Sequence, residues 1–158
     1  MPHFLSRVRL APVGAYLLVD LLAVGAGMGV PLFAILLGFA AGWLAPAWLA
    51  RAAAHWRHLL GLCLITAGLA SSFTFLLMVV IWGPALRMLF DPSADLANFG
   101  IPLILYEPTA SFIGWLVLMI VVSPGLQALA SSFASAVRLA WRPPALDPEP
   151  RRAAQPRA

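Results

Sequence analysis

One acidic side chain lies in the middle of an apolar stretch. Asp20 is the single charged residue between Leu10 and Ala50. A charge at the centre of a membrane helix costs roughly 2.5–3.5 kcal/mol on insertion scales, so such an acid is a candidate functional group. It can act as a proton carrier, a cation ligand or a substrate contact. It can equally be a protonated acid that only hydrogen-bonds to a neighbouring helix, and the sequence leaves both interpretations open.

The residues around Asp20 predict which way its side chain points. Tyr16, Asp20, Ala23 and Gly27 follow helical spacing, so they share one face of a predicted helix. Small residues on a face allow a second helix to approach closely. We therefore expect Asp20 to face protein rather than lipid, with Tyr16 one turn before it.

A weakly polar stripe in another apolar segment offers partners for this acid. Thr66, Ala70 and Thr74 recur every four residues, and Ser71 lies beside them. These hydroxyl groups could receive the carboxyl group. The alternative is an ordinary packing surface, in which each hydroxyl bonds to a carbonyl group of its own helix.

A second group of polar residues lies between two apolar segments. Arg87, Tyr106 and Glu107 would meet at one membrane surface, where they could act on lipid as a membrane enzyme. Glu107 could instead be an acid that the helix dipole favours near a helix N-terminus. The sequence Asp91-Pro92-Ser93 predicts a helix start, with Asp91 as the capping residue.

The sequence contains none of the common catalytic or metal-binding patterns. His3, His55 and His58 all lie outside the apolar segments, so no haem can be held by two histidines inside a helix bundle. A weak metal site at His55 and His58 is less favoured than a solvated loop. Cys63 lies among leucines and is expected to be an inert apolar residue. We predict no metal, no cofactor and no established catalytic residue.

Composition decides the class of protein that must position these residues. Of the 158 residues, 62% are hydrophobic and 10% are charged, and the mean hydropathy is +0.92. A soluble domain is nearer half apolar and a quarter charged. This excludes a soluble enzyme, a disordered regulator and a nucleic-acid-binding domain, despite a pI near 10.6. The sequence predicts an all-α polytopic membrane protein.

Breaks in the apolar pattern predict four spans, in two helical hairpins that form a four-helix bundle. The predicted spans are residues 11–28, 31–48, 59–82 and 109–130, and the last helix is expected to kink at Pro124-Gly125 and to continue to about residue 139. Pro31 should occupy the first turn of its helix. Gly38 and Gly42 form a small-xxx-small pair, which predicts close packing. Trp43 and Trp115 are expected to be packing residues.

The distribution of arginine supports this topology. Four spans place nine arginines on one side and Arg87 alone on the other, which is the asymmetry that cytoplasmic loops show. Both termini should then be cytoplasmic, in a plasma (inner) membrane. A three-span alternative with one long first helix distributes the arginines more evenly between the two sides of the membrane. An N-terminal signal peptide is a further alternative, disfavoured by Asp20 within the apolar run.

These features together predict one membrane domain, residues 1–141, followed by a disordered Pro- and Arg-rich tail, residues 142–158. We expect a small accessory subunit or transporter-like component in which Asp20 is the main functional group. Its partners would be the lipid bilayer and either further copies of itself or a larger membrane complex, and not nucleic acid. The alternative function is a membrane enzyme that acts on lipid at the outer surface, through Arg87, Tyr106 and Glu107.

Overall fold

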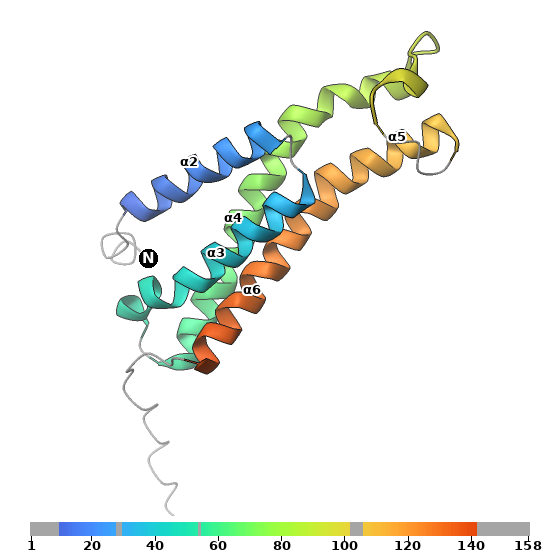
Figure 1. The fold of residues 1–158 in the computed structure, drawn as a ribbon. Coiled ribbons are helices and arrows are strands. Elements are labelled where there is room, and N and C mark those ends of the chain that lie inside the picture. Colours follow the sequence, from blue (N-terminus) through green and yellow to red (C-terminus); the bar gives the residue numbers. More distant parts are fainter. Residues whose placement is uncertain (1–9, 28–29, 54, 102–105, 142–158) are drawn as a thin grey trace, which may run out of the picture.

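The chain folds into helices joined by short connections (Figure 1). A computed structural model describes residues 10–27, 30–53, 55–101 and 106–141. Within these ranges all regular elements are helical, and no strand occurs. The elements are α2 (Leu10–Gly27), α3 (Pro31–Leu49), η1 (Ala50–Ala52), α4 (Trp56–Trp82), η2 (Gly83–Phe90), η3 (Leu96–Asn98), α5 (Pro108–Val117), π-helical η4 (Leu118–Val122) and α6 (Ser123–Trp141).

Three of the described helical segments are long and apolar enough to cross a membrane: Pro31–Ala52, Trp56–Phe90 and Pro108–Trp141. α2 is shorter, and its 18 residues correspond to about 27 Å at 1.5 Å per residue, against a hydrocarbon core of about 30 Å. The all-helical class is confirmed, and the fold is compatible with a helical membrane protein.

The first apolar block is divided as its glycines predict. α2 ends at Gly27 and α3 begins at Pro31, which lies in the first turn of its helix. The alternative with one long first helix is therefore wrong, because the backbone breaks where Pro31 lacks an N–H and the glycines lower the cost of leaving the helix. The predicted tail, residues 142–158, and the basic start of a potential signal peptide, residues 1–9, lie outside the described residues.

The last apolar segment is irregular near its proline, as expected, but one turn earlier. Pro124 has no N–H for the carbonyl group of Ile120, four residues before it. The chain accommodates this with the π-helical turn η4. The Ser123 hydroxyl donates to the Leu118 carbonyl at 3.1 Å, five residues back. Helix α6 then continues to Trp141, close to the predicted end at 139.

α3 and α6 form the most extensive helix pair of the bundle and run in the same direction, side by side in Figure 1. Gly38 faces the backbone of Gln127, and Gly42 faces that of Ser131, so closely that an added methyl group would overlap the carbonyl oxygen in each case. The predicted close packing at these two glycines is confirmed.

A proline inside α3 is compensated across the same interface. Pro46 is buried within the helix and cannot donate to the Gly42 carbonyl, four residues earlier. The buried Ser135 hydroxyl of α6 donates to that carbonyl at 2.9 Å. A hydroxyl from a neighbouring helix thus satisfies the acceptor that the proline leaves free, as membrane helices commonly require.

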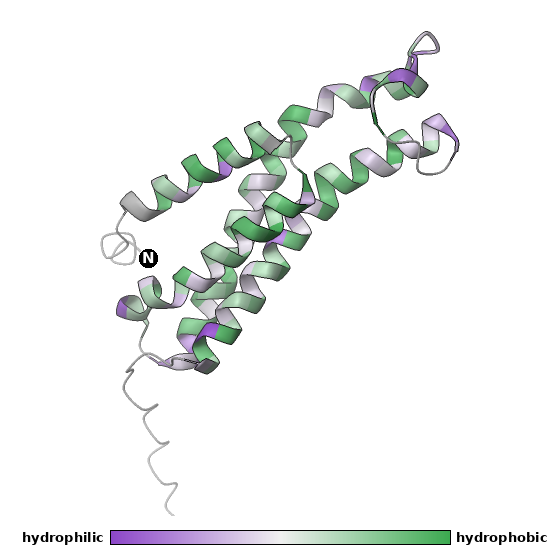
Figure 2. Cartoon of the chain, in the orientation of Figure 1, coloured by the Kyte–Doolittle hydropathy of each residue, from purple (hydrophilic) through white to green (hydrophobic). Residues whose placement is uncertain are grey.

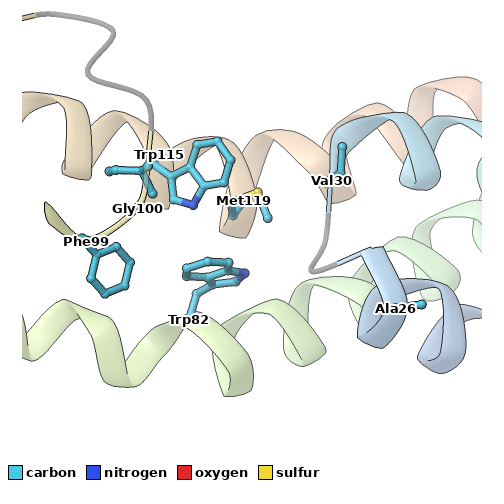
Figure 3. A pocket seen from close by; sticks show the side chains of 8 residues that line it. Ala26, Val30, Trp82, Phe99, Gly100, Trp115 and Met119 are labelled. Carbon is cyan, nitrogen blue, oxygen red and sulfur yellow. The ribbon is translucent and has the colours of Figure 1, made fainter.

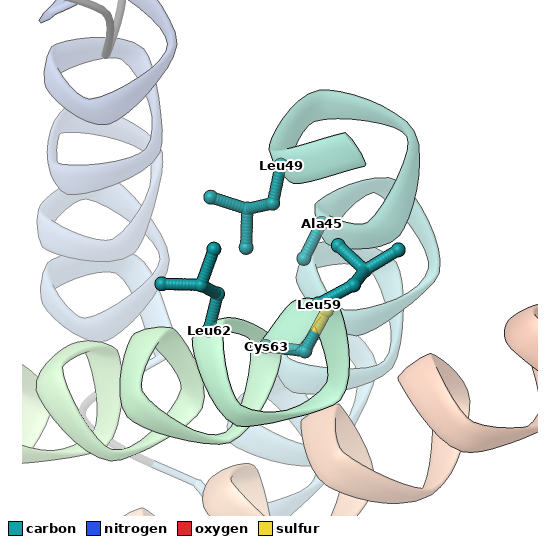
Figure 4. Close-up of a cluster of buried hydrophobic side chains, with 5 residues drawn as sticks. All are labelled: Ala45, Leu49, Leu59, Leu62 and Cys63. Atoms are coloured by element: carbon teal, nitrogen blue, oxygen red, sulfur yellow. The ribbon is translucent and has the colours of Figure 1, made fainter. Parts of the chain in front are cut away.

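Other contacts in the bundle are apolar or aromatic. Ala45, Leu49, Leu59, Leu62 and Cys63 form a buried cluster between α3 and α4 (Figure 4), so Cys63 is an apolar core residue, as predicted. Trp43 packs on Phe39 and Trp141, and the Arg138 guanidinium lies 5.3 Å from its ring centroid.

Apolar residues also cover the outside of the bundle. Figure 2 shows hydrophobic colours along the middles of the long helices and hydrophilic colours mainly towards their ends. Leu69, Val80 and Leu129 are 68%, 72% and 68% exposed. Only a minority of the large apolar side chains is buried within the chain, so the exterior must be covered by lipid or by protein.

Candidate functional site at Asp20

The sequence-predicted acid is buried on the inner face of α2. Asp20 is 1% exposed, and Val24, one turn later, is 5% exposed. Leu18 and Leu22, on the opposite side of the helix, are 56% and 61% exposed. The helical spacing therefore predicted the direction of Asp20 correctly: it faces protein.

Thr74 of α4 is the closest partner of this acid. Its hydroxyl lies 2.7 Å from Asp20 Oδ2 and 3.2 Å from the Ala70 carbonyl oxygen. A threonine hydroxyl carries one hydrogen and also accepts hydrogen bonds. Thr74 can therefore donate to Asp20, or it can donate to Ala70 and accept from a protonated Asp20.

Gln127 of α6 completes the cluster from a third helix. Its Nε2 donates to the Tyr16 hydroxyl at 2.6 Å and lies 3.4 Å from Asp20 Oδ1. Its Oε1 is buried without a hydrogen-bond partner among the described residues. Gln127 was not predicted as a site residue. A polar amide side chain inside a predicted span was the feature that could have indicated it.

The resulting site joins three helices through hydrogen bonds and contains no salt bridge. Among the residues that the structure describes, no basic side chain pairs with Asp20. With Asp20 ionised, both Thr74 and Gln127 act as donors to it. With Asp20 protonated, Oδ2 can donate to Thr74, whose own hydrogen then goes to Ala70. The same positions thus provide a hydrogen-bond scheme for each protonation state.

The other hydroxyls of the predicted stripe have separate roles. Thr66 donates to the Leu62 carbonyl of its own helix at 2.8 Å, which is the local alternative for such a residue. Ser71 donates to the Pro124 carbonyl at 2.5 Å and so links α4 to α6. Of this stripe, Thr74 alone has a hydrogen bond to the Asp20 carboxyl group in the described structure.

The second predicted group has a structural explanation at Glu107. Its carboxylate accepts hydrogen bonds from the backbone N–H groups of Thr109 and Ala110 and so caps α5. These contacts, that of Ala110 above all, hold the pKa of Glu107 below its usual value. Tyr106 is 97% exposed and Arg87 is also exposed. Within the described ranges, no hydrogen bond or ion pair joins Arg87, Tyr106 and Glu107.

The predicted helix start at Asp91 is wrong. Asp91 accepts from the hydroxyl and the N–H of Ser93, which closes a local turn without a helix. The helical turn η3 begins later, where Asp95 accepts from the N–H and the side chain of Asn98. The turn wins because a short acidic side chain can bond to its own backbone two residues on. Hydrogen bonds from Ser93 and Asn98 lower the pKa of Asp91 and of Asp95, respectively.

The last candidates are the histidines. The rings of His55 and His58 are 5.9 Å apart, and His3 lies outside the described residues. No cluster of three or more His, Cys, Asp or Glu side chains that could hold a metal occurs in the described ranges. Comparisons with protein-family models, curated proteins and solved structures find no match for this chain.

Proposed function

We propose that this chain is a four-span integral membrane protein in which Asp20 takes up and releases a proton. The three long apolar segments provide three spans, and α2 is the fourth. In this proposal the bundle lies in the plasma (inner) membrane, and the arginine distribution places both termini in the cytoplasm.

The observation that carries the functional part is the environment of Asp20. This carboxyl group is buried with uncharged partners, and the hydrogen of Thr74 can turn either towards it or towards Ala70. A group that has hydrogen-bond partners in both protonation states can exchange a proton without repacking of the helices. An intramembrane acid of this kind is characteristic of proton relays in transporters.

The cluster also contains an unused acceptor. Gln127 Oε1 is buried and lacks a donor within the described structure, although its amide lies beside the Asp20 carboxyl group. Buried acceptors are costly to leave unpaired. A proton-carrying water or a small cation reaching Asp20 would find a second oxygen ligand there, which supports transport over a purely structural role.

Helix packing favours a component of a larger assembly over an independent channel. α2 contacts the bundle mainly through α4 and α3, and its outward face carries exposed leucines. Four helices alone do not readily enclose a transmembrane path. We therefore propose a transporter-like component or accessory subunit that acts as a homo-oligomer or within a larger membrane complex.

Proton flux in proteoliposomes containing the gently extracted native assembly tests this function. Wild-type protein and Asp20→Asn are compared by an internal pH dye under an imposed proton gradient, with Thr66→Val as the matched control. We expect Asp20→Asn to be inserted normally and to lose flux, and Thr66→Val to retain it. Flux that is equal in all three proteins would contradict the role of Asp20.

Orientation is tested separately with a reporter fused to the C-terminus. The proposed topology predicts a cytoplasmic reporter. A translocated C-terminus would show that the number of spans or their direction is wrong, even if Asp20 carried protons.

A further inference from the structure

A cavity whose lining residues include none of the Asp20 cluster lies where Ala26 and Val30 face the end of α4 and the last turns of α5 (Figure 3). Its volume is about 520 Å³, within the range of small-molecule sites. The residues that surround it include Ala26, Val30, Trp82, Phe99, Trp115 and Met119, and none of its lining residues is charged.

Two hydrogen-bond donors in this wall have no acceptor in the part of the chain that the structure describes. The indole Nε1 atoms of Trp82 and Trp115 are both buried and unpartnered among the described residues. The two rings meet edge to face, with centroids 6.3 Å apart. Buried tryptophan N–H groups normally find a partner, so two orphan donors on one cavity indicate an absent acceptor.

The wall chemistry selects the class of ligand. Water alone leaves most of this wall unmatched, because the lining side chains are apolar apart from the two indole N–H groups. A flat aromatic ring cannot stack between the indoles, because their planes are inclined by 77°. A flexible hydrocarbon chain with a carbonyl acceptor matches both the apolar wall and the free N–H groups.

The position of the cavity supplies a source for such a chain. Ala26 and Val30 line the cavity and are exposed, so the cavity is open where these two residues border it. In the membrane placement proposed above, this is the outer end of the bundle, at the depth where interfacial tryptophans meet lipid ester groups. The absence of a charged lining residue leaves a lipid head group outside the cavity.

We infer that this cavity binds one acyl chain of a diester glycerophospholipid, whose ester carbonyl accepts hydrogen bonds from Trp82 and Trp115. The inference depends on the membrane placement but not on the role of Asp20. Membrane placement is checked independently, by whether the expressed protein sediments with membranes and resists alkaline extraction.

Indole NMR tests the inference. Full-length protein labelled with ¹⁵N at its six tryptophans, in dodecyl maltoside micelles, is titrated with dimyristoyl phosphatidylcholine and, separately, with the diether analogue of this lipid. Trp82→Phe and Trp115→Phe assign the two signals. We expect both N–H signals to move downfield and to saturate with the diester lipid only, while the exposed Trp56 signal stays in place.

Two variants distinguish a site from general lipid contact. Ala26→Phe should fill the cavity and abolish the saturable shift, whereas Ala40→Phe, on the exposed face of α3, should leave it unchanged. Equal shifts with the diester and diether lipids would overturn the carbonyl contact. A non-saturating shift, no shift, or a shift that survives Ala26→Phe would overturn the lipid site.

Discussion

The hydroxyl of Thr74 lies 2.7 Å from the carboxylate of Asp20, although the two residues are 54 positions apart in the chain. Because Thr74 also lies 3.2 Å from the Ala70 carbonyl, its single hydrogen has two alternative acceptors. This arrangement connects α2 to α4 and gives the buried acid partners in either protonation state.

Removal of the Thr74 hydroxyl should destabilise the bundle. Thr74→Val keeps the shape of the side chain but leaves Asp20 without its closest partner, and we expect a loss of about 1–3 kcal/mol in the free energy of unfolding. Unfolding in mixed detergent micelles measures this. Thr74→Ser should retain most of the stability, and Thr66→Val, which removes only a bond within one helix, should cost less. Equal losses for Thr66→Val and Thr74→Val would contradict a special role for Thr74.

The Ser135 hydroxyl should be important because of Pro46. It satisfies the Gly42 carbonyl that this proline leaves without an N–H, so Ser135→Ala should cost about 1–3 kcal/mol of unfolding free energy. In Pro46→Ala the N–H returns, and Ser135→Ala should then cost distinctly less. A double-mutant cycle measures this coupling. Strictly additive effects would show that the serine does not compensate for the proline.

Close contact between α3 and α6 depends on two glycines. A methyl group at Gly42 would overlap the backbone of Ser131, so Gly42→Ala should force the helices apart and destabilise the protein by roughly 1–3 kcal/mol. Gly68→Ala on α4 is the matched control, because a methyl group there meets nothing within 4 Å. This control should gain up to about 1 kcal/mol from helix propensity. Thermal unfolding in detergent compares the two, and an equal response of both variants would refute the contact.

Acidification should release the cap of α5. The pKa of Glu107 is lowered in the folded state, so its contribution to stability is complete above the unfolded pKa, roughly 4.3, and disappears as the pH falls through the lower folded value. The backbone amide signals of Thr109 and Ala110 should titrate together in NMR, with a midpoint below roughly 4.3. Glu107→Gln should abolish this step. A midpoint at or above the unfolded value would contradict the capping geometry.

Sequence periodicity predicts the positions of side chains only where a helix is regular. The burial of Asp20 and its contact with Thr74 follow from regular helices, in which spacing defines a face. The faces of α6 could not be predicted, because the π-helical turn η4 adds residues to one turn and rotates every later side chain about the helix axis. Gln127 and Ser135 both lie beyond that turn. Their contacts with Asp20 and Gly42 depend on this rotation.

The connection between α4 and α5 was less predictable for a different reason. Asp91 and Glu107 both precede a proline, and each resembles a helix cap in sequence. Glu107 caps a helix, whereas Asp91 closes a turn with Ser93. Local hydrogen bonds of similar strength decide between these outcomes, and the tertiary contacts that stabilise one of them are absent from the sequence pattern. The cavity beside Trp82 and Trp115 likewise depends on how distant segments pack.

Infrared spectroscopy of the carboxyl groups tests the central claim most directly. Wild-type protein, Asp20→Asn and the exposed-loop control Asp91→Asn are reconstituted in lipid and titrated with pH, and the C=O stretching band of protonated carboxylic acids is followed. The other acids contribute bands of their own, and besides these we predict one reversible band that is present in the wild type and in Asp91→Asn and missing from Asp20→Asn. Identical titrations of the wild type and Asp20→Asn would show that Asp20 does not exchange a proton and would contradict the account.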